Sequence, residues 1–420
     1  MAKIQDKNLR YSLLKHYVYF MFKWAYRKVE YYGKENIPQD GAIIYAPNHT
    51  NTLMDALAIL AIDSRPKIFV ARADVFKHPT ALKFLTFLKM LPINRKRDGV
   101  GNLAKNEDVN NIVVDALQDK VPFCILPEGT HRAMHSLMPL QKGLFRIALQ
   151  ANDTFGSRMP VYIVPVGIEF GHFFRYRSSL LVQIGKPIHV TQFIAQHPDL
   201  AVPEQINALR NELAGRLKEL ILHIPDDAHY NAAFALAQVC GHKNSLIDRF
   251  KAAKEAINRL ADVTETQPLF DTAEDLSRQR HRLGIGMESV LHPHIGWSVA
   301  GKILLLLAGF PLFIASSVAT SPISLLAAWL CAKFEDPAFH NTLRCMIASA
   351  LAPVLSLLTG LIFGMVFSWV WGVTAALLLF PSFLFLHEYL RWFRLLISHI
   401  KWLLHRDLYR QFNQIKNFKR

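Results

Sequence analysis

Hydrophobic and polar positions alternate in short blocks between residues 30 and 225. Apolar runs rich in Val, Ile, Phe and Tyr favour strands, and they cover residues 41–46, 67–71, 121–126, 161–168 and 179–185. Segments with helical periodicity separate or follow these runs, at residues 53–62, 79–90, 103–118, 139–151 and 204–223. Strands that alternate with helices predict an α/β domain over residues 30–225, with a mixed, largely parallel sheet flanked by helices.

The pattern changes twice after residue 225. Residues 226–296 are polar and helix-prone, which predicts a helical connector. Residues 297–390 are apolar and include two blocks without a charged residue, 303–332 and 345–386. Because about 20 apolar residues cross a bilayer, this region predicts an all-α membrane region made of hydrophobic hairpins with two or four crossings. A buried soluble core is the alternative interpretation of such blocks.

Two local features predict where these blocks turn. Pro311 and the Ser/Thr/Pro cluster at 316–322 divide the first block. Trp369 and Trp371 lie in the middle of the second block. Because tryptophan favours the membrane–water interface, a turn at an interface is expected near these two residues.

The two ends of the chain carry most of its net charge of +15, because residues 1–28 contribute +6 and residues 391–420 contribute +7. Both ends are also rich in Tyr, Trp and Phe, a combination that suits the anionic headgroup layer of a bilayer. We therefore expect an amphipathic interfacial helix within residues 1–29, helical over 9–28, and a basic aromatic helix at 391–420. A core helix is the alternative at the N-terminus. Binding of single-stranded nucleic acid is a second alternative, but the neighbouring apolar blocks favour lipid, and no nucleic-acid partner is expected.

Targeting and redox signals predict a membrane protein whose catalytic domain lies on the cytoplasmic side. Lys15, Lys23 and Arg27 interrupt the apolar segment that a secretory signal would need. Basic residues cluster before the first apolar block and after the last one, so both termini and the catalytic domain are expected on the cytoplasmic side. The four cysteines are scattered without the spacing of metal ligands, which fits a reducing compartment and no metal site.

A histidine follows the first predicted strand of the α/β domain directly. His49 lies in "APNHTNTLMDA", with Asp55 six residues further on. A neutral imidazole can remove a proton from a hydroxyl, and it does so better when a carboxylate orients the ring. The two side chains can meet only if His49 lies in a loop and Asp55 lies in the next helix. A structural histidine is the alternative interpretation.

Three further clusters lie at predicted strand ends. "LPINRKRDG" places Arg95, Lys96 and Arg97 after an apolar segment, where they would form a phosphate clamp or a solvated charge run. "ILPEGTHR" places Glu128, Gly129, Thr130, His131 and Arg132 in a turn after a buried strand. "VPVGI" contains Pro165 within a strand, which predicts an edge or a bulge.

Together these four stretches resemble the glycerolphosphate acyltransferase family, which transfers fatty acyl groups to glycerol-3-phosphate and lysophospholipids. The family pattern of Asn-His and a spaced Asp is similar to "NHTNTLMD", and its Phe-Pro-Glu-Gly-Thr-Arg block is similar to "LPEGTHR", with Leu126 in place of Phe and His131 inserted. Five residues separate His49 from Asp55, a spacing similar to that of the fungal-type acyltransferases acting on glycerol-3-phosphate and dihydroxyacetone phosphate. The resemblance covers roughly residues 30–225 and implies the glycerolphosphate acyltransferase fold.

The resemblance also implies roles for the residues of the four stretches. His49 would act as general base and Asp55 would orient it. Arg95 would hold the substrate phosphate, helped by Lys96 or Arg97. The glycerol acceptor would be positioned by Glu128 and Gly129, with weaker contributions from Thr130 and Arg132. Pro165 would shape a substrate groove. The acyl donor would be acyl-CoA or acyl carrier protein, with no bound cofactor and no metal.

The acceptor of the acyl group stays open at this point. The spacing favours glycerol-3-phosphate, and therefore a glycerol-3-phosphate 1-O-acyltransferase of phospholipid synthesis. A 1-acylglycerol-3-phosphate (lysophosphatidate) or another lysophospholipid is the alternative. A non-enzymatic scaffold that shapes membranes, with an inactive acyltransferase domain, is the alternative from a different class of protein. In each case the lipid bilayer is an expected partner.

Overall fold

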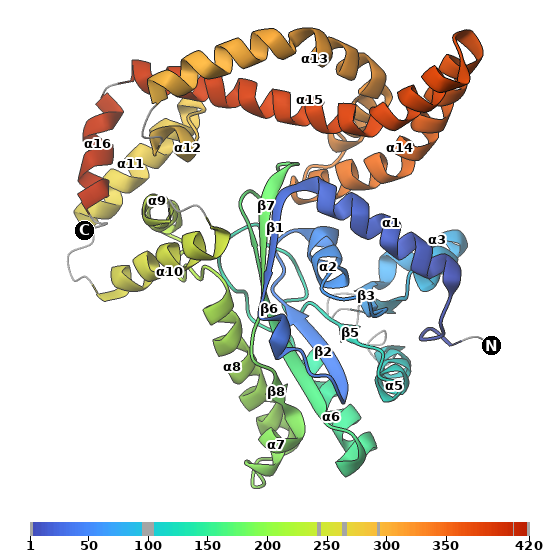
Figure 1. Cartoon of the computed structure of the whole chain (residues 1–420). Coiled ribbons are helices and arrows are strands. Elements are labelled where there is room, and N and C mark those ends of the chain that lie inside the picture. The colour runs from blue at the N-terminus through green and yellow to red at the C-terminus, as the bar shows by residue number, and fades with distance from the viewer. Residues whose placement is uncertain are drawn as a thin grey trace. The chain divides into compact units, whose positions relative to one another are not determined.

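The computed structural model describes residues 3–94, 105–241, 245–262, 267–291, 295–405 and 407–417. The chain separates into two compact units, of which the first comprises Met1–Phe174 and Ser178–Ile221 and the second comprises Arg175–Arg177 and Leu222–Arg420. The first unit contains a β-sheet with flanking helices, and the described elements of the second unit are helices (Figure 1). The predicted fold class, an α/β domain followed by an all-α region with apolar helices, is therefore confirmed.

The sheet has eight strands in the order β1-β7-β6-β2-β5-β3-β4, with β8 paired to β6. All neighbouring pairs are parallel except β6 with β7 and β6 with β8, so the sheet is mixed and largely parallel, as predicted. The strands are β1 (Tyr26–Tyr32), β2 (Ala42–Pro47), β3 (Ile68–Arg72), β4 (Met90–Ile93), β5 (Phe123–Cys124), β6 (Val161–Phe170), β7 (Ser178–Ile184) and β8 (Ile188–His189).

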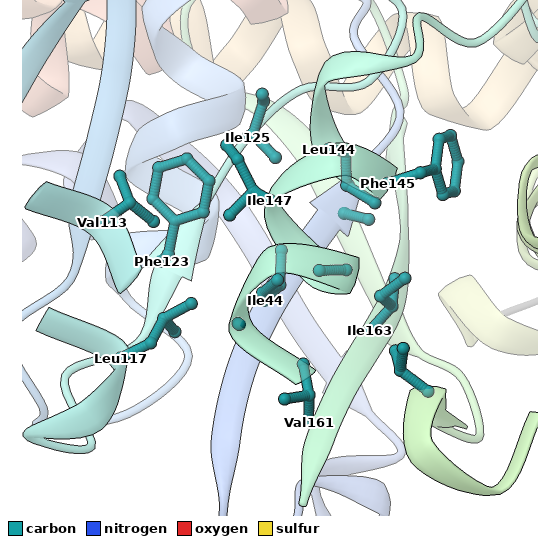
Figure 2. Packing of buried hydrophobic residues seen from close by; sticks show 14 of the residues in the cluster. Ile44, Val113, Leu117, Phe123, Ile125, Leu144, Phe145, Ile147, Val161 and Ile163 are labelled. Atoms are coloured by element: carbon teal, nitrogen blue, oxygen red, sulfur yellow. The ribbon is translucent and has the colours of Figure 1, made fainter. Parts of the chain in front are cut away.

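Helices cover both faces of this sheet because alternate residues of each strand point to opposite sides. Ile44 of β2 belongs to a hydrophobic core shared with helices on one face, shown in Figure 2 with its partners from β5 and β6. Tyr45 points to the other face, where its hydroxyl donates to Asp63 Oδ2 at 3.2 Å. The helices of this unit are α1 (Leu9–Ala25), α2 (Thr52–Leu60), α3 (Pro79–Phe87), α5 (Lys105–Gln118), α6 (Gly143–Phe155), α7 (Val190–Ala195) and α8 (Val202–Leu220).

The N-terminal helix is shorter than predicted. α1 ends at Ala25, and Tyr26–Tyr32 form β1, which the hydrophobic pattern did not reveal because the strand is mostly polar. Lys15 of α1 is buried, and its ammonium donates to the carbonyl oxygens of Asp63, Ser64 and Arg65 at 3.3, 2.6 and 2.7 Å. Lys15 therefore ties α1 to the loop after α2. The interfacial role of this helix stays a prediction.

Pro165 was predicted at an edge or a bulge, but it lies in β6, an interior strand, and the register between β2 and β6 passes through it without a shift. The structure shows why proline is tolerated there. On the side of β6 to which the Pro165 carbonyl points, β8 pairs with Tyr162 and Ile163, and β7 pairs from Val166 onward. Pro165 falls where one partner strand replaces the other, and its carbonyl accepts from the Gly185 amide at 2.9 Å. The missing proline N–H therefore interrupts no ladder hydrogen bond.

The second unit contains the predicted helical connector and the predicted membrane region. Within residues 226–296, the next two helices along the chain, α10 and α11, pack against α9. The C-terminal helix α16 also packs against α9 and α11. The predicted boundary at residue 390 falls inside α15, which runs through it without a break. The helices are α9 (Tyr230–Cys240), α10 (Leu246–Asp262), α11 (Gln267–Leu283), α12 (Met287–Val290), α13 (Ile295–Cys331), α14 (Ala338–Val366), α15 (Trp369–Leu404) and α16 (Asp407–Asn417).

Three helices of the described chain, α13, α14 and α15, are long and apolar enough to span a membrane. The predicted number of crossings was two or four, and three candidate helices do not match an even number; the number of crossings stays a prediction. α13 continues through Pro311 and Pro322 and bends along its length (Figure 1), so the predicted division at these prolines is a bend and not a break. A turn at Phe367–Ser368 joins α14 to α15 directly before Trp369, as predicted.

Candidate active site

Three of the four sequence blocks lie at one edge of the sheet in the described residues, because parallel strands end on the same side. β2 leads into Asn48 and His49, β5 leads into the Glu128 turn, and β6 ends beside them. Asn48 extends the β2–β6 ladder with its side chain. Its amide group donates to the Ile168 carbonyl at 3.1 Å, and its Oδ1 accepts from the Ile168 amide at 2.6 Å. The start of the His49 loop is thereby fixed to the neighbouring strand.

His49 and Asp55 form a hydrogen-bonded pair, in the arrangement that the sequence predicted. His49 lies in the loop after β2, and Asp55 lies in the first turn of α2. The distance from His49 Nδ1 to Asp55 Oδ2 is 2.8 Å. The same oxygen accepts the backbone N–H groups of Thr50 and Asn51 at 2.9 and 2.7 Å. Three donors thus stabilise a carboxylate that is fully buried.

This pairing prepares the histidine ring to act as a base. With Nδ1–H donated to Asp55, the lone pair of the neutral ring is on Nε2. No described residue forms a hydrogen bond with Nε2, and the side chain of His49 keeps 16% of its surface exposed. The ring is therefore oriented on one side and open on the other. Its edge also meets the His131 ring, with ring centroids 5.6 Å apart.

The Glu128 carboxyl group accepts hydrogen bonds from two backbone segments, the His49 loop and the segment after β5. Its Oε1 accepts the His49 N–H at 2.6 Å, and its Oε2 accepts the Met138 N–H at 2.9 Å. The side chain is buried, and burial raises the pKa of Glu128 to about 7, although the two backbone hydrogen bonds act in the opposite direction. Glu128 thus connects the His49 loop to the segment after β5. Its predicted role in binding the acceptor stays a prediction.

The rest of the turn after β5 lies at the surface of the site. Gly129 has a φ of +71°, and a Cβ atom there would lie 3.0 Å from Cγ of Gln141, so glycine is required. Gly129 and Thr130 are exposed. The Arg132 backbone N–H donates to the His49 carbonyl at 3.3 Å, which brings this segment alongside the His49 loop. The structure brings Thr130 and Arg132 to the site region, and their roles toward substrate stay predictions.

A second histidine–carboxylate pair, which the sequence analysis missed, lies beneath the same segment. His135 Nδ1 and Glu169 Oε2 are 2.7 Å apart, and both side chains are buried. The His135 ring also packs on Phe173, and the Asn51 side chain donates to the Phe173 carbonyl at 2.7 Å. These contacts connect the Glu128 segment, the end of β6 and the His49 loop. The only signal in the sequence was a histidine four residues after His131, which has no distinctive spacing.

The predicted phosphate clamp and the predicted groove residue lie in different parts of the chain. Arg95, Lys96 and Arg97 lie outside the described residues, and β4 ends two residues before them at the same sheet edge. Pro165 is buried in β6 opposite Ala46, so it belongs to the sheet below the His49 loop. Its proposed part in a substrate groove stays a prediction. Gly167 in the same block allows the Leu220 carbonyl to approach, since a Cβ atom would lie only 2.2 Å from that oxygen.

Comparison with known proteins identifies relatives of this region. Residues 28–169 match the Acyltransferase family model. A 1-acyl-sn-glycerol-3-phosphate acyltransferase of Cocos nucifera is 27% identical over 164 residues, which are 39% of this chain and 49% of the coconut protein. The enzyme of the same name from Bacillus subtilis is 23% identical over 192 residues, 46% of this chain and 87% of the bacterial protein.

Among solved structures, the 1-acyl-sn-glycerophosphate acyltransferase of Thermotoga maritima matches with a TM-score of 0.36 and 21% identity, over 50% of this chain and 77% of that chain. The matched part of this chain spans about half the length of the coconut relative. The family match includes His49, Asp55, Glu128 and Pro165. Residues 28–169, about a third of this chain, are thus similar to the Acyltransferase family model, and the chain is similar in part to two 1-acyl-sn-glycerol-3-phosphate acyltransferases.

Proposed function

We propose that this chain transfers a fatty acyl group from an acyl thioester to the free hydroxyl of a 1-acylglycerol-3-phosphate. The observation that carries the proposal is the His49–Asp55 pair, whose ring is held at Nδ1 and open at Nε2. Such a ring can remove a proton from an alcohol. The domain match supports acyl transfer as the reaction class.

The reaction needs no covalent enzyme intermediate. His49 Nε2 takes the proton of the acceptor hydroxyl as its oxygen attacks the thioester carbonyl carbon. Asp55 stabilises the imidazolium that forms, and its two backbone hydrogen bonds keep the carboxylate in place. The C–S bond then breaks, and the departing thiolate takes the proton from Nε2. Acyl-CoA and acyl carrier protein both supply such a thioester, and each fits the proposal.

The acceptor is proposed from the relatives and not from the spacing. Both curated relatives are named as 1-acyl-sn-glycerol-3-phosphate acyltransferases, which supports the monoacylated acceptor over glycerol-3-phosphate. The five residues between His49 and Asp55 do not decide between these acceptors, because the pair forms as soon as Asp55 lies in the first turn of α2. The resemblance to the fungal-type branch therefore does not identify the acceptor. Arg95 remains the proposed ligand of the substrate phosphate.

The apolar helices support a role at the membrane. A monoacylated acceptor and a diacylated product leave a bilayer only at a cost of about 0.8 kcal/mol for each exposed CH₂ group. Helices α13, α14 and α15 have the length and hydropathy to anchor the chain in the same bilayer. We propose that the protein is an integral membrane protein with its catalytic domain and both termini on the cytoplasmic side, an orientation that requires two of these three helices, and not all three, to cross the bilayer.

A membrane-fraction assay with labelled acyl-CoA tests the proposal. Glycerol-3-phosphate and 1-acylglycerol-3-phosphate are offered side by side, and label is expected in the diacylated product. His49→Ala should lower the rate by about 10² to 10⁴-fold, and His16→Ala, which changes an exposed histidine of α1, should not. Transfer to glycerol-3-phosphate alone would overturn the acceptor. Equal turnover by wild type and His49→Ala would overturn the mechanism. If wild type transfers no label, and His49→Ala has the same membrane phenotype as wild type, the non-enzymatic scaffold is favoured.

A further inference from the structure

Arginines gather at one end of the α14–α15 hairpin. Arg344 directly precedes the uncharged block 345–386, and Arg391 and Arg394 follow it. The two helices pack closely and antiparallel, since a Cβ atom on Gly372 would lie 2.5 Å from the Gly360 carbonyl oxygen. Arg344 lies 16 residues before Gly360 on α14, and Glu388 lies 16 residues after Gly372 on α15. Because the helices are antiparallel, Arg344 and Glu388 lie at about the same height along the hairpin. The charged residues before and after the block therefore meet at the same level.

This level lies far from the turn of the hairpin. Phe367 follows Arg344 by 23 positions, and a helix of this length measures roughly 35 Å. The hydrocarbon core of a bilayer is about 30 Å thick. With the aromatic turn near one interface, the arginines would lie in the headgroup layer of the other.

Within this cluster, one carboxylate fixes two of the arginines. Glu388, Arg391 and Arg394 follow one another at intervals of three residues and so share a face of α15. Glu388 Oε2 accepts from Arg391 Nε at 3.0 Å. Its Oε1 accepts from Arg177 Nε at 3.1 Å and lies 3.0 Å from Arg177 Nη2. Arg177 belongs to the short segment Arg175–Arg177 that is part of the second unit.

Two other arginines of the cluster have no acidic partner. Arg394 lies in electrostatic range of Arg175, Arg344 and Arg391, all of which repel it. Arg175 and Arg394 are exposed, and neither has a carboxylate partner within the part of the chain that the structure describes. Like charges held this close favour an anion between them.

We propose that Arg175, Arg177, Arg344, Arg391 and Arg394 form a binding site for the phosphate of a membrane phospholipid headgroup. Guanidinium groups bind phosphate through paired hydrogen bonds. A lipid source is favoured over free phosphate because the cluster lies where the uncharged block ends, and because the exposed Phe393 of α15 offers an apolar contact beside it. Basic pockets at the ends of membrane helices bind headgroups in this way.

The test measures binding by the full-length chain in detergent micelles, without an acyl donor. Dihexanoyl phosphatidic acid, dihexanoyl phosphatidylcholine and inorganic phosphate are titrated separately. The double variant Arg175→Gln/Arg394→Gln removes the two arginines without an acidic partner and leaves the Glu388 bridges intact. Arg278→Gln, an exposed arginine of α11, is the matched control. We expect the double variant to weaken binding of the phosphatidic acid at least about tenfold and the control to bind as wild type.

The three probes distinguish the sources of phosphate. Phosphatidic acid is expected to bind more tightly than inorganic phosphate, because only the lipid also contacts apolar surface. Equal affinity for both would overturn the lipid assignment, and unchanged binding by the double variant would overturn the site. His49→Ala should bind the lipid as wild type does, so the outcome is independent of the proposed acyl transfer.

Discussion

The two units of this chain place polar and apolar side chains in opposite ways. In the first unit, the buried Asn48, Asp55 and Glu128 are each held by two or more hydrogen bonds, mostly to the backbone. In the second unit, large apolar side chains such as Val370 and Leu377 are about three-quarters exposed. The comparison shows that a reacting group needs a polar scaffold that fixes its geometry, whereas a surface that meets lipid needs length and apolarity.

Replacing Asp55 is expected to have the largest effect on the polar scaffold. Asp55→Asn removes the charge that stabilises the imidazolium, and the amide cannot accept all three hydrogen bonds while keeping its own donors satisfied. The rate of acyl transfer should fall by about 10² to 10⁴-fold. Steady-state assays on the membrane fraction measure it, with Asp227→Asn, an exposed aspartate of the second unit, as the control. Wild-type turnover by Asp55→Asn would contradict the assigned role of this carboxylate.

Glu128 makes the stability of the first unit depend on pH. The pKa of this buried carboxyl is raised to about 7 from an ordinary value of 4.5, so the folded state disfavours its ionisation. The free energy of unfolding of wild type, relative to Glu128→Gln, should fall by about 1.4 kcal/mol per pH unit as pH rises between these two values. Below pH 4.5 and above pH 7 the difference should be constant.

Denaturant unfolding of the two proteins over this pH range measures the effect. Glu204→Gln, an exposed side chain at the start of α8, serves as the comparison and should show no such slope. A difference between wild type and Glu128→Gln that does not change with pH would mean that Glu128 stays ionised in the fold.

The apolar unit can be tested at its closest helix contact. Gly372→Leu places a side chain where even a Cβ atom would lie 2.5 Å from the Gly360 carbonyl oxygen, so α14 and α15 must separate. We expect a cost of about 1–3 kcal/mol. Disulfide trapping between cysteines at Ser356 and Ala376, whose Oγ and carbonyl oxygen are 2.5 Å apart, reports the separation. Gly301→Leu, which meets no atom within 4 Å, should leave trapping unchanged.

The smallest effect is expected at the second histidine–carboxylate pair. Glu169→Gln keeps an acceptor for His135 but removes the charge, so the hydrogen bond weakens and is not lost. A change of about 1 kcal/mol would lower the rate roughly fivefold. His135→Leu, which leaves Glu169 buried without this histidine, should lower activity and thermal stability further. If both variants match wild type, the pair does not position the Glu128 segment.

The sequence predicted those parts of the site that are encoded locally. The six-residue offset between His49 and Asp55 requires a loop and a helix start, and both are present. The His49 and Glu128 blocks follow strands whose ends share one edge of the sheet, and the Pro165 block lies within β6, which ends at the same edge. Contacts between distant segments were not predictable in this way, because nothing near Glu128 reveals that it accepts the backbone N–H of His49. The same holds for His135 and Glu169.

The errors in the predicted fold have similar physical origins. β1 was missed because an edge strand with Arg27, Lys28 and Glu30 carries no hydrophobic alternation. Pro165 was assigned to an edge because the rule for proline in strands assumes one continuous neighbour on each side. Lys15 was interpreted as a charge that interrupts an apolar segment, but in the fold three carbonyl groups accept hydrogen bonds from its ammonium. In all three examples, contacts with segments distant in the sequence determine the observed structure.

Lys15 has a mechanical consequence for the active site. The loop it holds directly follows α2, and the first turn of α2 carries Asp55. A displacement of α1 therefore also acts on the loop that follows the helix carrying Asp55, the partner of His49. A surface that tilts α1 would thus also strain α2, whose first turn aligns Asp55 with His49.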